Sequence, residues 1–378
     1  MDYILTSFLL FTAVVRSTPV PATSSRSCKD YSVPLNITSL NLQWGIDPIE
    51  TNEDMAAFNA EWGRRDSAST FHPAVLPSNS TPEMAVYTIS GTYCEPTSGG
   101  NGTVLLATHG AGYGRNYWDP DIQPENYSFV DYALAEGYSI FYYDRLGVGE
   151  SEIVSGYVSQ VSNQAAILTE LVKLIRSGTF SSPPAKVVLL GHSFGSIVSN
   201  VALHNDPELV DAALLTGLAY EATGVIGAIS NQAKQNRVAN LYEPERFGKL
   251  DGGFAVWVDI YSAIENFFKV PFFDEEVVQW AQDNQQPAAL LENLSIGFAN
   301  VSSPAFTGPV MIMCGEYDFI ACGGYCPGFI DADIHEVFPA SKNVVAYVHP
   351  DSGHAINLSL NATGAFQVLG NFLKENGL

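Results

Sequence analysis

The sequence predicts an α/β fold, a mostly parallel, doubly wound sheet with an inserted helical cap. The first observation is an alternation of short, continuous apolar runs with helical patterns, which is typical of parallel strands covered by helices on both faces. The second is a lapse of more than 80 residues in this alternation, between about Glu221 and Pro304, too long for a loop in a compact domain. The third is size, because 378 residues of which 46% are hydrophobic can bury a large core.

The alternation begins after an N-terminal part of different character. Residues 18–35 are rich in Ser, Thr and Pro and are expected to form a loose arm. Residues 39–46 and 84–93 alternate in polarity like antiparallel strands, and residues 52–62 are expected to form a short helix between them. The expected strands of the parallel set are 103–108, 139–143, 185–190, 212–215, 310–314 and 344–348. The expected core helices are 127–135, 160–176, 196–203 and 355–374, and those of the cap are 222–234, 254–268, 274–280 and 288–294.

These patterns divide the chain into five parts. They are a signal peptide (1–17), an N-terminal extension with the first strand (18–83), the first part of the core (84–220), the cap (221–305) and the second part of the core (306–378). The signal peptide is inferred from an apolar stretch over residues 4–15, which would cover roughly 18 Å as a helix. That is short of the ~30 Å core of a bilayer, and no later stretch is long enough, so no integral membrane association is expected.

Asn-x-Ser/Thr sequons support export from the cell. They begin at Asn36, Asn79, Asn101, Asn126, Asn293, Asn300, Asn357 and Asn361. One sequon can arise by chance, but eight in a chain of this size are well above a casual rate. Their number therefore favours a secreted, extracellular glycoprotein.

The five cysteines fit an oxidising compartment. Cys314 falls within an expected buried strand and is expected to be a free thiol. We therefore expect Cys28 to pair with Cys94, which would fix the N-terminal extension, and Cys322 to pair with Cys326, which closes a small Gly-rich loop. By loop entropy the longer bridge contributes roughly 4 kcal/mol. A metal site here lacks histidines at ligand spacing, so no metal is expected.

The net charge excludes one class of partner. Lys and Arg number 17 against 40 Asp and Glu, which gives a formal net charge of −23. A surface of this sign repels phosphate backbones and anionic lipid, so we expect no nucleic-acid partner. The acidity itself is interpreted as a means of solubility in an extracellular setting.

Residues 191–195 read Gly-His-Ser-Phe-Gly between an apolar strand and a helix. This G-x-S-x-G pattern on a strand-to-helix turn is the nucleophile elbow, in which the serine hydroxyl stands clear of the sheet. Glycine two positions before and two after the serine lets the strand and the helix approach closely. The pattern predicts Ser193 as a nucleophile, and the alternative is a Gly-rich turn with an incidental serine.

The first strand of the alternation ends in a loop of small residues, His-Gly-Ala-Gly-Tyr-Gly at 109–114. In open parallel sheets, ligands bind beyond the carboxyl ends of the strands, so this loop can turn backbone amides toward a ligand. Acyl transfer passes through an oxyanion that needs two N–H donors, and the amides of Ala111 and Phe194 can supply them. The loop matches neither a dinucleotide fingerprint nor a phosphate-binding loop, and the alternative is a plain turn.

A candidate acid lies beyond the strand 310–314. Asp318 occupies the position where a carboxylate could fix the tautomer of an imidazole, with Glu316, Asp331 and Asp333 as alternatives.

The candidate base is His354, on the loop after the last strand, with Gly353 giving that loop freedom to turn inward. His349 is its rival, restrained by the following proline. At a further strand end, Asp144 and Arg145 are interpreted as a structural ion pair that shapes the turn.

In this order the motifs resemble the α/β-hydrolase superfamily, over nearly all of the chain from about residue 84 to the end. The resemblance rests on five motifs at strand ends: His109-Gly110, the turn at 144–151, the elbow at 191–195, Asp318 and Gly353-His354. The chain order Ser, Asp, His is the family's own. The resemblance implies that Ser193 is the nucleophile, Asp318 the orienting acid and His354 the general base. It also implies that the amides of Ala111 and Phe194 are the oxyanion donors and that the reaction needs no cofactor.

The sequence looks most like the cap-bearing branch of this superfamily, which has a single His-Gly dipeptide. This resemblance implies a secreted serine hydrolase that cleaves carboxylic esters. Peptidase, lactonase and thioesterase activities use the same triad on this fold and stay open, as does a catalytically silent binding protein. Epoxide hydrolase and haloalkane dehalogenase activities are not expected, because a nucleophilic Asp is absent. The expected partner is a small molecule with an apolar acyl or aromatic group. The cap residues that either line its pocket or form the cap's own core are Phe254, Trp257, Tyr261, Phe267, Phe268, Phe272, Phe273 and Trp280.

Overall fold

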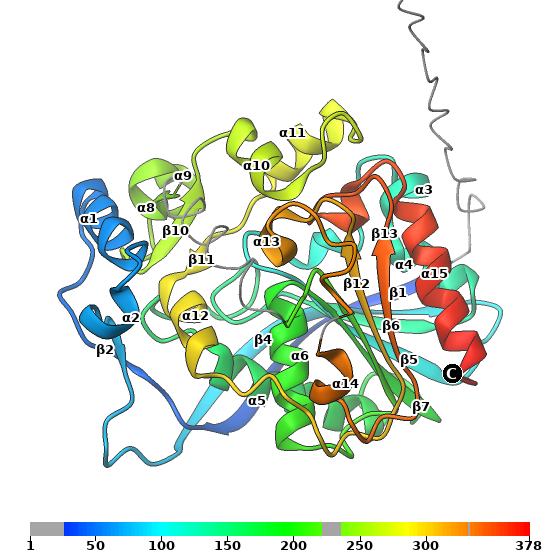
Figure 1. The fold of residues 1–378 in the computed structure, drawn as a ribbon. Helices are drawn as coiled ribbons and strands as arrows, with labels where there is room; N and C mark the ends of the chain where they lie inside the picture. Colours follow the sequence, from blue (N-terminus) through cyan, green and yellow to red (C-terminus); the bar gives the residue numbers. More distant parts are fainter. Residues whose placement is uncertain (1–25, 221–235, 332) are drawn as a thin grey trace, which may run out of the picture.

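The computed structural model describes residues 26–220, 236–331 and 333–378. Its centre is an eight-stranded sheet with helices on both faces, as Figure 1 shows. In spatial order the strands are β1 (Arg26–Ser39), β4 (Glu83–Pro96), β6 (Ser139–Tyr143), β5 (Thr103–Thr108), β7 (Lys186–His192), β8 (Ala212–Thr216), β12 (Val310–Gly315) and β13 (Val344–His349). Strand β4 runs antiparallel to both of its neighbours, and the other neighbouring pairs are parallel. The predicted α/β class with a mostly parallel sheet is confirmed.

Two apolar cores cover the two faces of this sheet. Successive residues of a strand point to opposite faces, so Leu105 and Ala107 enter one core whereas Val104 and Leu106 enter the other. The first core is closed by α3 (Pro124–Tyr127), α4 (Phe129–Ala135) and α15 (Ala362–Glu375). The second is closed by α5 (Val161–Arg176), α6 (Phe194–Asn205) and α14 (Ile334–Val337). Burial on both faces explains why these strands read as continuous apolar runs.

The N-terminal arm differs from the expectation. Residues 26–39 form the edge strand β1, paired with β4 along its whole length, so the predicted loose arm is wrong for this part; residues 18–25 lie outside the described range. Of the strand expected at 39–46, only β2 (Gln43–Trp44) is formed, and it pairs with β3 (Ala74–Val75) in a separate sheet. An edge strand with one exposed face is polar at every second position, and this polarity resembles that of a loop.

Both expected disulfide pairs are present. Cys28 lies directly opposite Cys94 in the β1–β4 register, and the two sulfurs are 2.01 Å apart. Cys322 is bonded to Cys326 just after β12, and Cys314 is a free, buried thiol. The first bridge therefore ties the edge strand to the sheet.

The inserted segment contains strands as well as helices. Its part from residue 236 onward holds a three-stranded antiparallel sheet in the order β11 (Ala288–Ala289), β10 (Phe254–Trp257) and β9 (Asn236–Val238). Its helices are α8 (Ala239–Tyr242), α9 (Pro244–Phe247), α10 (Ile260–Phe267), α11 (Glu275–Asp283), α12 (Leu290–Ser295) and the 3-10 turn η2 (Ile296–Phe298). The helix expected at 254–268 is wrong in its first half, because Asp259 caps a new helix there by accepting the N–H of Ser262 at 2.9 Å. The helix expected at 222–234 lies outside the described residues.

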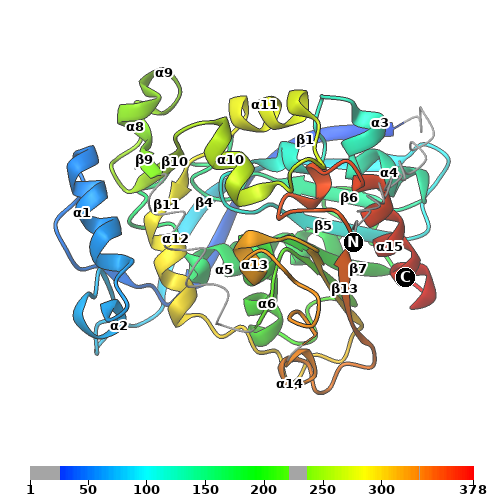
Figure 2. The same cartoon turned by 45° about the horizontal axis from the view of Figure 1, so that its top comes forward.

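The N-terminal extension packs against this inserted segment. Helix α1 (Asn52–Trp62), formed where predicted and followed by α2 (Ser67–Thr70), buries Met55 and Phe58 against Val238 and Leu290 of the insertion. The side chain of Asn52 accepts the N–H of Val238 at 3.0 Å. In Figures 1 and 2, helices α1 and α2 lie on the same side of the molecule as the small sheet of the insertion.

The last helix begins later than predicted. Instead of one helix over 355–374, a 3-10 turn η3 (Ile356–Leu358) precedes α15. The shorter elements η1 (Arg115–Tyr117) and α13 (Phe319–Cys322) follow β5 and β12. Within the described part of the chain, no helix has both the length and the apolar character needed to cross a bilayer.

Candidate active site

The turn between β7 and α6 holds Ser193 in the strained conformation of an elbow. Its φ of 52° and ψ of −119° are rare for a residue with a side chain. A Cβ on Gly195 would collide with the carbonyl of Thr108 in β5, so α6 can begin this close to the sheet only with glycine there. The local structure around Ser193 is therefore the one that the G-x-S-x-G pattern requires.

Asp318 and His354 meet although 36 residues separate them. They follow the parallel neighbours β12 and β13, in which Gly315 lies opposite His349. Nδ1 of His354 is 2.8 Å from Oδ2 of Asp318, and the two residues are 1% and 0% exposed. The other carboxylate oxygen accepts the N–H of Ala321 at 2.8 Å. A carboxylate fixed in this way can hold the imidazole with its proton on Nδ1 and its lone pair on Nε2.

The ring of His354 lies beside the elbow. Its centroid is 5.0 Å from that of His192, the residue before Ser193. Both rings border Gly217, where a Cβ would lie 3.0 Å from Cε1 of His354 and 2.9 Å from Cε1 of His192. Gly110 borders the elbow too, since a Cβ there would lie 3.0 Å from Cβ of Ser193. The structure thus brings the elbow, the Asp318–His354 pair and the loop 109–114 to one end of the sheet.

His192 is a packed, neutral imidazole. Its Nδ1 is 3.1 Å from the hydroxyl of Thr216, which itself donates to the carbonyl of Gly191, so Nδ1 carries the proton. Burial, with a smaller contribution from His354, lowers the pKa of His192 well below its usual value. The ring also stacks on Tyr117 with centroids 4.4 Å apart.

Two of the other candidate residues, His349 and Glu316, have partners elsewhere, and Asp331 and Asp333 are exposed. Nε2 of His349 lies 2.8 Å from the carbonyl of Asn361, and burial lowers the pKa of His349. The carboxylate of Glu316 accepts the N–H of Asp351 at 3.2 Å. It is Asp318 that contacts His354.

The expected ion pair between Asp144 and Arg145 is wrong. Asp144 instead accepts the backbone N–H groups of Arg115 at 2.8 Å and Glu150 at 3.1 Å, while burial raises the pKa of Asp144. Arg145 pairs with Glu292, on helix α12 of the insertion. Adjacent side chains at a strand end point to opposite sides, so each finds a partner from a different element.

Two aromatic residues of the insertion cover this end of the sheet. The rings of Trp257 and Phe267 stack with centroids 5.4 Å apart, and Phe267 also lies 5.9 Å from the ring of His354. Phe267 meets Tyr113 of the loop 109–114 at 5.5 Å, and a Cβ on Gly112 would lie 3.6 Å from Trp257. These rings border a hollow of about 10 Å³, room for about one water molecule.

The remaining aromatic residues of the insertion have other surroundings. Phe254 is buried in a separate cluster, Phe268 and Phe273 pack on each other at 5.8 Å, and Tyr261 is 71% exposed. The aromatic set is therefore divided, since Trp257 and Phe267 lie at the candidate site and others pack elsewhere. That any of them lines an acyl pocket stays a prediction.

A hollow of about 670 Å³ lies elsewhere, between β1, α5 and the C-terminal end of α6. It shares no residue with the elbow, the Asp318–His354 pair or the loop 109–114. Size alone is therefore a poor guide to the candidate site in this molecule.

The sequons differ in exposure. Asn357 is the middle residue of η3 and is 2% exposed, so the folded chain leaves no room for a glycan on its side chain. The exposed sequon asparagines are Asn36, Asn79, Asn101 and Asn300, and the half-buried ones are Asn126, Asn293 and Asn361.

Comparison with known proteins supplies the family. The model of the alpha/beta hydrolase family matches residues 104–364, which is more than half of the chain. The chain therefore belongs to the alpha/beta hydrolase family.

Two solved structures share this fold. An esterase from Thermogutta terrifontis is 18% identical with a TM-score of 0.53, and the match covers 76% of this chain and 94% of that one. The epoxide hydrolase VrEH1 from Vigna radiata is 17% identical with a TM-score of 0.50, and the match covers 76% of this chain and 95% of that one. At these identities the likeness shows the fold alone. No curated protein matches the chain.

Proposed function

We propose that this chain is a secreted serine hydrolase that cleaves a carboxylic ester through an acyl-enzyme. The observation that carries the proposal is the buried 2.8 Å contact between Nδ1 of His354 and Asp318, beside the strained elbow of Ser193. Because Nδ1 is engaged by the carboxylate, Nε2 is the nitrogen that remains to take a proton from a hydroxyl.

The reaction has two halves. Nε2 of His354 takes the hydroxyl proton as Oγ of Ser193 attacks the ester carbonyl, and the imidazolium then protonates the leaving alcohol as the ester C–O bond breaks. In the second half, His354 takes a proton from water, the hydroxide attacks the acyl carbon, and the acid leaves as Ser193 regains its proton. Asp318 stabilises the imidazolium in both halves.

The developing oxyanion needs donors that are already in place. The N–H of Phe194 is the first amide of α6, where the helix dipole also favours negative charge. The N–H of Ala111 is the proposed second donor, on the loop whose Gly110 lies against Cβ of Ser193.

The substrate is proposed to be a small molecule with a compact apolar or aromatic group. Phe267 lies over His354 and stacks on Trp257, which gives the site an apolar wall, and the hollow of about 10 Å³ beside these rings leaves little room there for a longer chain. Extracellular location is supported by the two disulfides and by exposed sequons such as Asn36 and Asn300.

A fluorophosphonate probe tests the nucleophile. We expect a covalent adduct that mass spectrometry locates on Ser193, and no adduct on S193A or on urea-unfolded protein. A native protein that stays unlabelled would favour a binding protein on a hydrolase scaffold and end the proposal.

A substrate panel then tests the reaction. Esters of graded acyl length, amides, thioesters and lactones should be assayed side by side with wild type and S193A. We expect the highest kcat/KM on short-chain esters, whereas a preference for amides, thioesters or lactones would move the assignment to peptidase, thioesterase or lactonase.

A further inference from the structure

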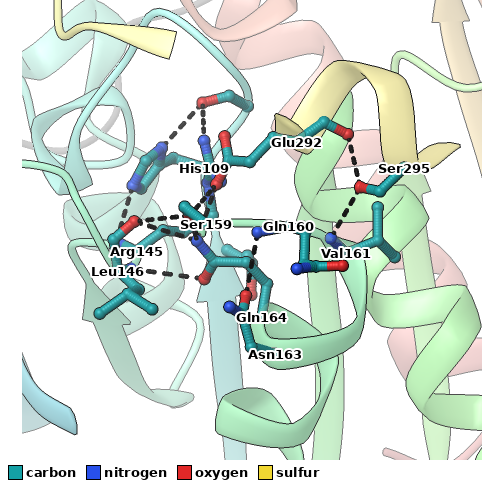
Figure 3. A network of polar contacts seen from close by, with 12 residues as sticks. His109, Arg145, Leu146, Ser159, Gln160, Val161, Asn163, Gln164, Glu292 and Ser295 are labelled. Atoms are coloured by element: carbon teal, nitrogen blue, oxygen red, sulfur yellow. Dashed lines mark hydrogen bonds and ion pairs between the residues drawn. The ribbon is translucent and has the colours of Figure 1, made fainter. Parts of the chain in front are cut away.

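A buried ion pair joins the insertion to the core beneath the candidate site. Arg145, at the end of β6, is 0% exposed, and Glu292, on α12, is 2% exposed. Figure 3 shows Nη1 of Arg145 directed at Oε1 of Glu292, which also accepts from Ser159 at 3.0 Å and Gln164 at 2.7 Å. The carboxylate from the insertion is thus held by three donors of the core.

Arg145 also touches the peptide that precedes Ala111. Its Nη2 lies 3.5 Å from the carbonyl of Gly110, and Nδ1 of His109 lies 2.8 Å from the same oxygen. Nε2 of His109 accepts the N–H of Arg145 at 3.0 Å, which places the imidazole proton on Nδ1. The Gly110 carbonyl therefore accepts two hydrogen bonds, one from His109 and one from Arg145.

Fixing this carbonyl also fixes an amide. The Gly110–Ala111 peptide bond is trans, so its C=O and N–H point in opposite directions. A carbonyl held toward His109 and Arg145 turns the N–H of Ala111 away from them. Gly110 itself lies against Ser193, so the peptide whose orientation is fixed in this way belongs to the part of the loop that borders the nucleophile.

Arg145 reaches the second proposed donor as well. Its guanidinium carbon is 4.6 Å from the centroid of the Phe194 ring, and Phe194 supplies the other amide. One side chain therefore contacts the ring of one proposed donor residue and the carbonyl behind the other.

The pair is poorly built for stability. Buried ion pairs rarely exceed the stability of an apolar replacement, because removing two charges from water is costly. Among the described residues, Oε2 of Glu292 and Nε of Arg145 have no hydrogen-bond partner, so part of that cost is uncompensated. A positioning role explains why charges occur here.

We propose that Arg145 and Glu292 are positioning residues that hold the two oxyanion amides in place and make this arrangement depend on the docked insertion. The inference rests on the proposed function, because it assigns a role to the same oxyanion site. Glu292 acts through Arg145, and Arg145 acts through the Gly110 carbonyl and the Phe194 ring.

The test is the apolar double variant R145M/E292L, which removes both charges together and leaves no unpaired ion. We expect its Tm to stay close to wild type, its KM to change less than about twofold, and its kcat to fall roughly 10–50-fold, less than loss of a whole donor. Affinity for an alkyl boronic acid, whose tetrahedral adduct occupies the oxyanion site, should fall in parallel with kcat. The matched control is D211N, which disrupts the Arg176–Asp211 pair at 2.8 Å between α5 and the start of β8 and should leave kcat per folded molecule unchanged.

Each outcome is decisive. A folded double variant with wild-type kcat and boronate affinity shows a purely structural pair and overturns the inference. If the double variant does not fold, R145K replaces it, because lysine keeps a cation opposite Glu292 but lacks the planar fork; kcat should then fall about fivefold or more, and an unchanged kcat overturns the inference. Failure of the wild type to label at Ser193 would instead end the proposed function itself.

Discussion

Two buried pairs of polar side chains lie at the same end of the sheet, and they differ in origin. Asp318 and His354 come from loops after adjacent strands, whereas Arg145 and Glu292 come from a core turn and an inserted helix 147 residues away. The members of the first pair are 0% and 1% exposed and those of the second 0% and 2%. The two pairs are therefore equally buried but have different proposed roles. Asp318 and His354 are proposed to transfer a proton, and Arg145 and Glu292 are proposed to hold the backbone of the oxyanion amides in place.

The comparison also shows how the insertion reaches the site. It meets the Asp318–His354 pair through the ring of Phe267 and meets Arg145 through the carboxylate of Glu292. One contact is apolar and adjustable, and the other is charged and buried. Changes to the first should alter which substrates fit, and changes to the second should alter catalysis and stability.

The largest effect is expected at the first pair. D318N keeps the size of the side chain but favours the wrong tautomer of His354, so kcat should fall by about 10⁴-fold while the fold is retained. Steady-state kinetics with active-site titration measures this loss. E316Q is the control, because Glu316 lies in the same loop and accepts the N–H of Asp351 instead, and it should change kcat less than about twofold. Equal losses in D318N and E316Q would remove Asp318 from the triad.

The second pair should dominate stability when only one partner is removed. E292Q leaves the guanidinium of Arg145 buried without its counter-charge and should lower the free energy of unfolding by about 3–5 kcal/mol. Urea unfolding of E136Q provides the comparison, because the Glu136–Lys374 pair lies at the surface, with Lys374 exposed and Glu136 half-buried, and should be worth at most about 1 kcal/mol. If E292Q and E136Q are equally stable, the Arg145 charge is compensated by some other group.

The first pair could be predicted from the sequence, and the partner of Arg145 in the second pair could not. Asp318 and His354 were predictable because short loops after parallel strands meet at one sheet edge, and strands β5 and β6 coincide with the expected 103–108 and 139–143. Glu292 lies on a helix of six residues, and its role depends on its contact with Arg145, which is distant in the sequence. No local sequence pattern predicts such a contact.

The errors in the fold have a similar physical cause. Strand β1 is exposed over Arg26–Asp30 and then at every second position, because one of its faces is open to solvent, and the polar residues there resemble an arm. Strands β9 and β11 are three and two residues long, too short for any periodicity to be detected, so the insertion was predicted as helices alone. Pairing across long separations decides these elements.

Each buried pair has a neutral histidine beside it, and stability should depend on pH as a result. Burial is the main cause that lowers the pKa of His109 beside Arg145, of His192 beside His354, and of His349 nearby. Below about pH 6.5 these histidines take up protons in the unfolded chain but stay neutral in the folded chain. Their contribution to the free energy of unfolding is therefore complete above that pH and is lost as the pH falls toward their folded pKa values. The limiting slope is roughly 1.4 kcal/mol per pH unit for each histidine.

Urea midpoints between pH 5.5 and 7.5 measure this slope. H349Q removes one of the three histidines without touching either pair and should make the loss of stability below about pH 6.5 less steep. An H349Q variant with the slope of the wild type would mean that His349 is protonated in the fold.

The smallest effect is expected at the apolar contact of the insertion. F267A removes the ring that stacks on His354 and enlarges the hollow of about 10 Å³ beside Trp257. A larger hollow should favour longer acyl chains, so kcat/KM for short-chain esters should fall roughly 5–10-fold and the preference should shift toward longer chains. Competition between acetyl and hexanoyl esters measures the shift. Y261A on the same helix is the matched control, since Tyr261 is 71% exposed, and it should leave the preference unchanged. If F267A lowers kcat for every acyl length equally, Phe267 holds the imidazole in place, and the insertion would then act on both buried pairs in the same way.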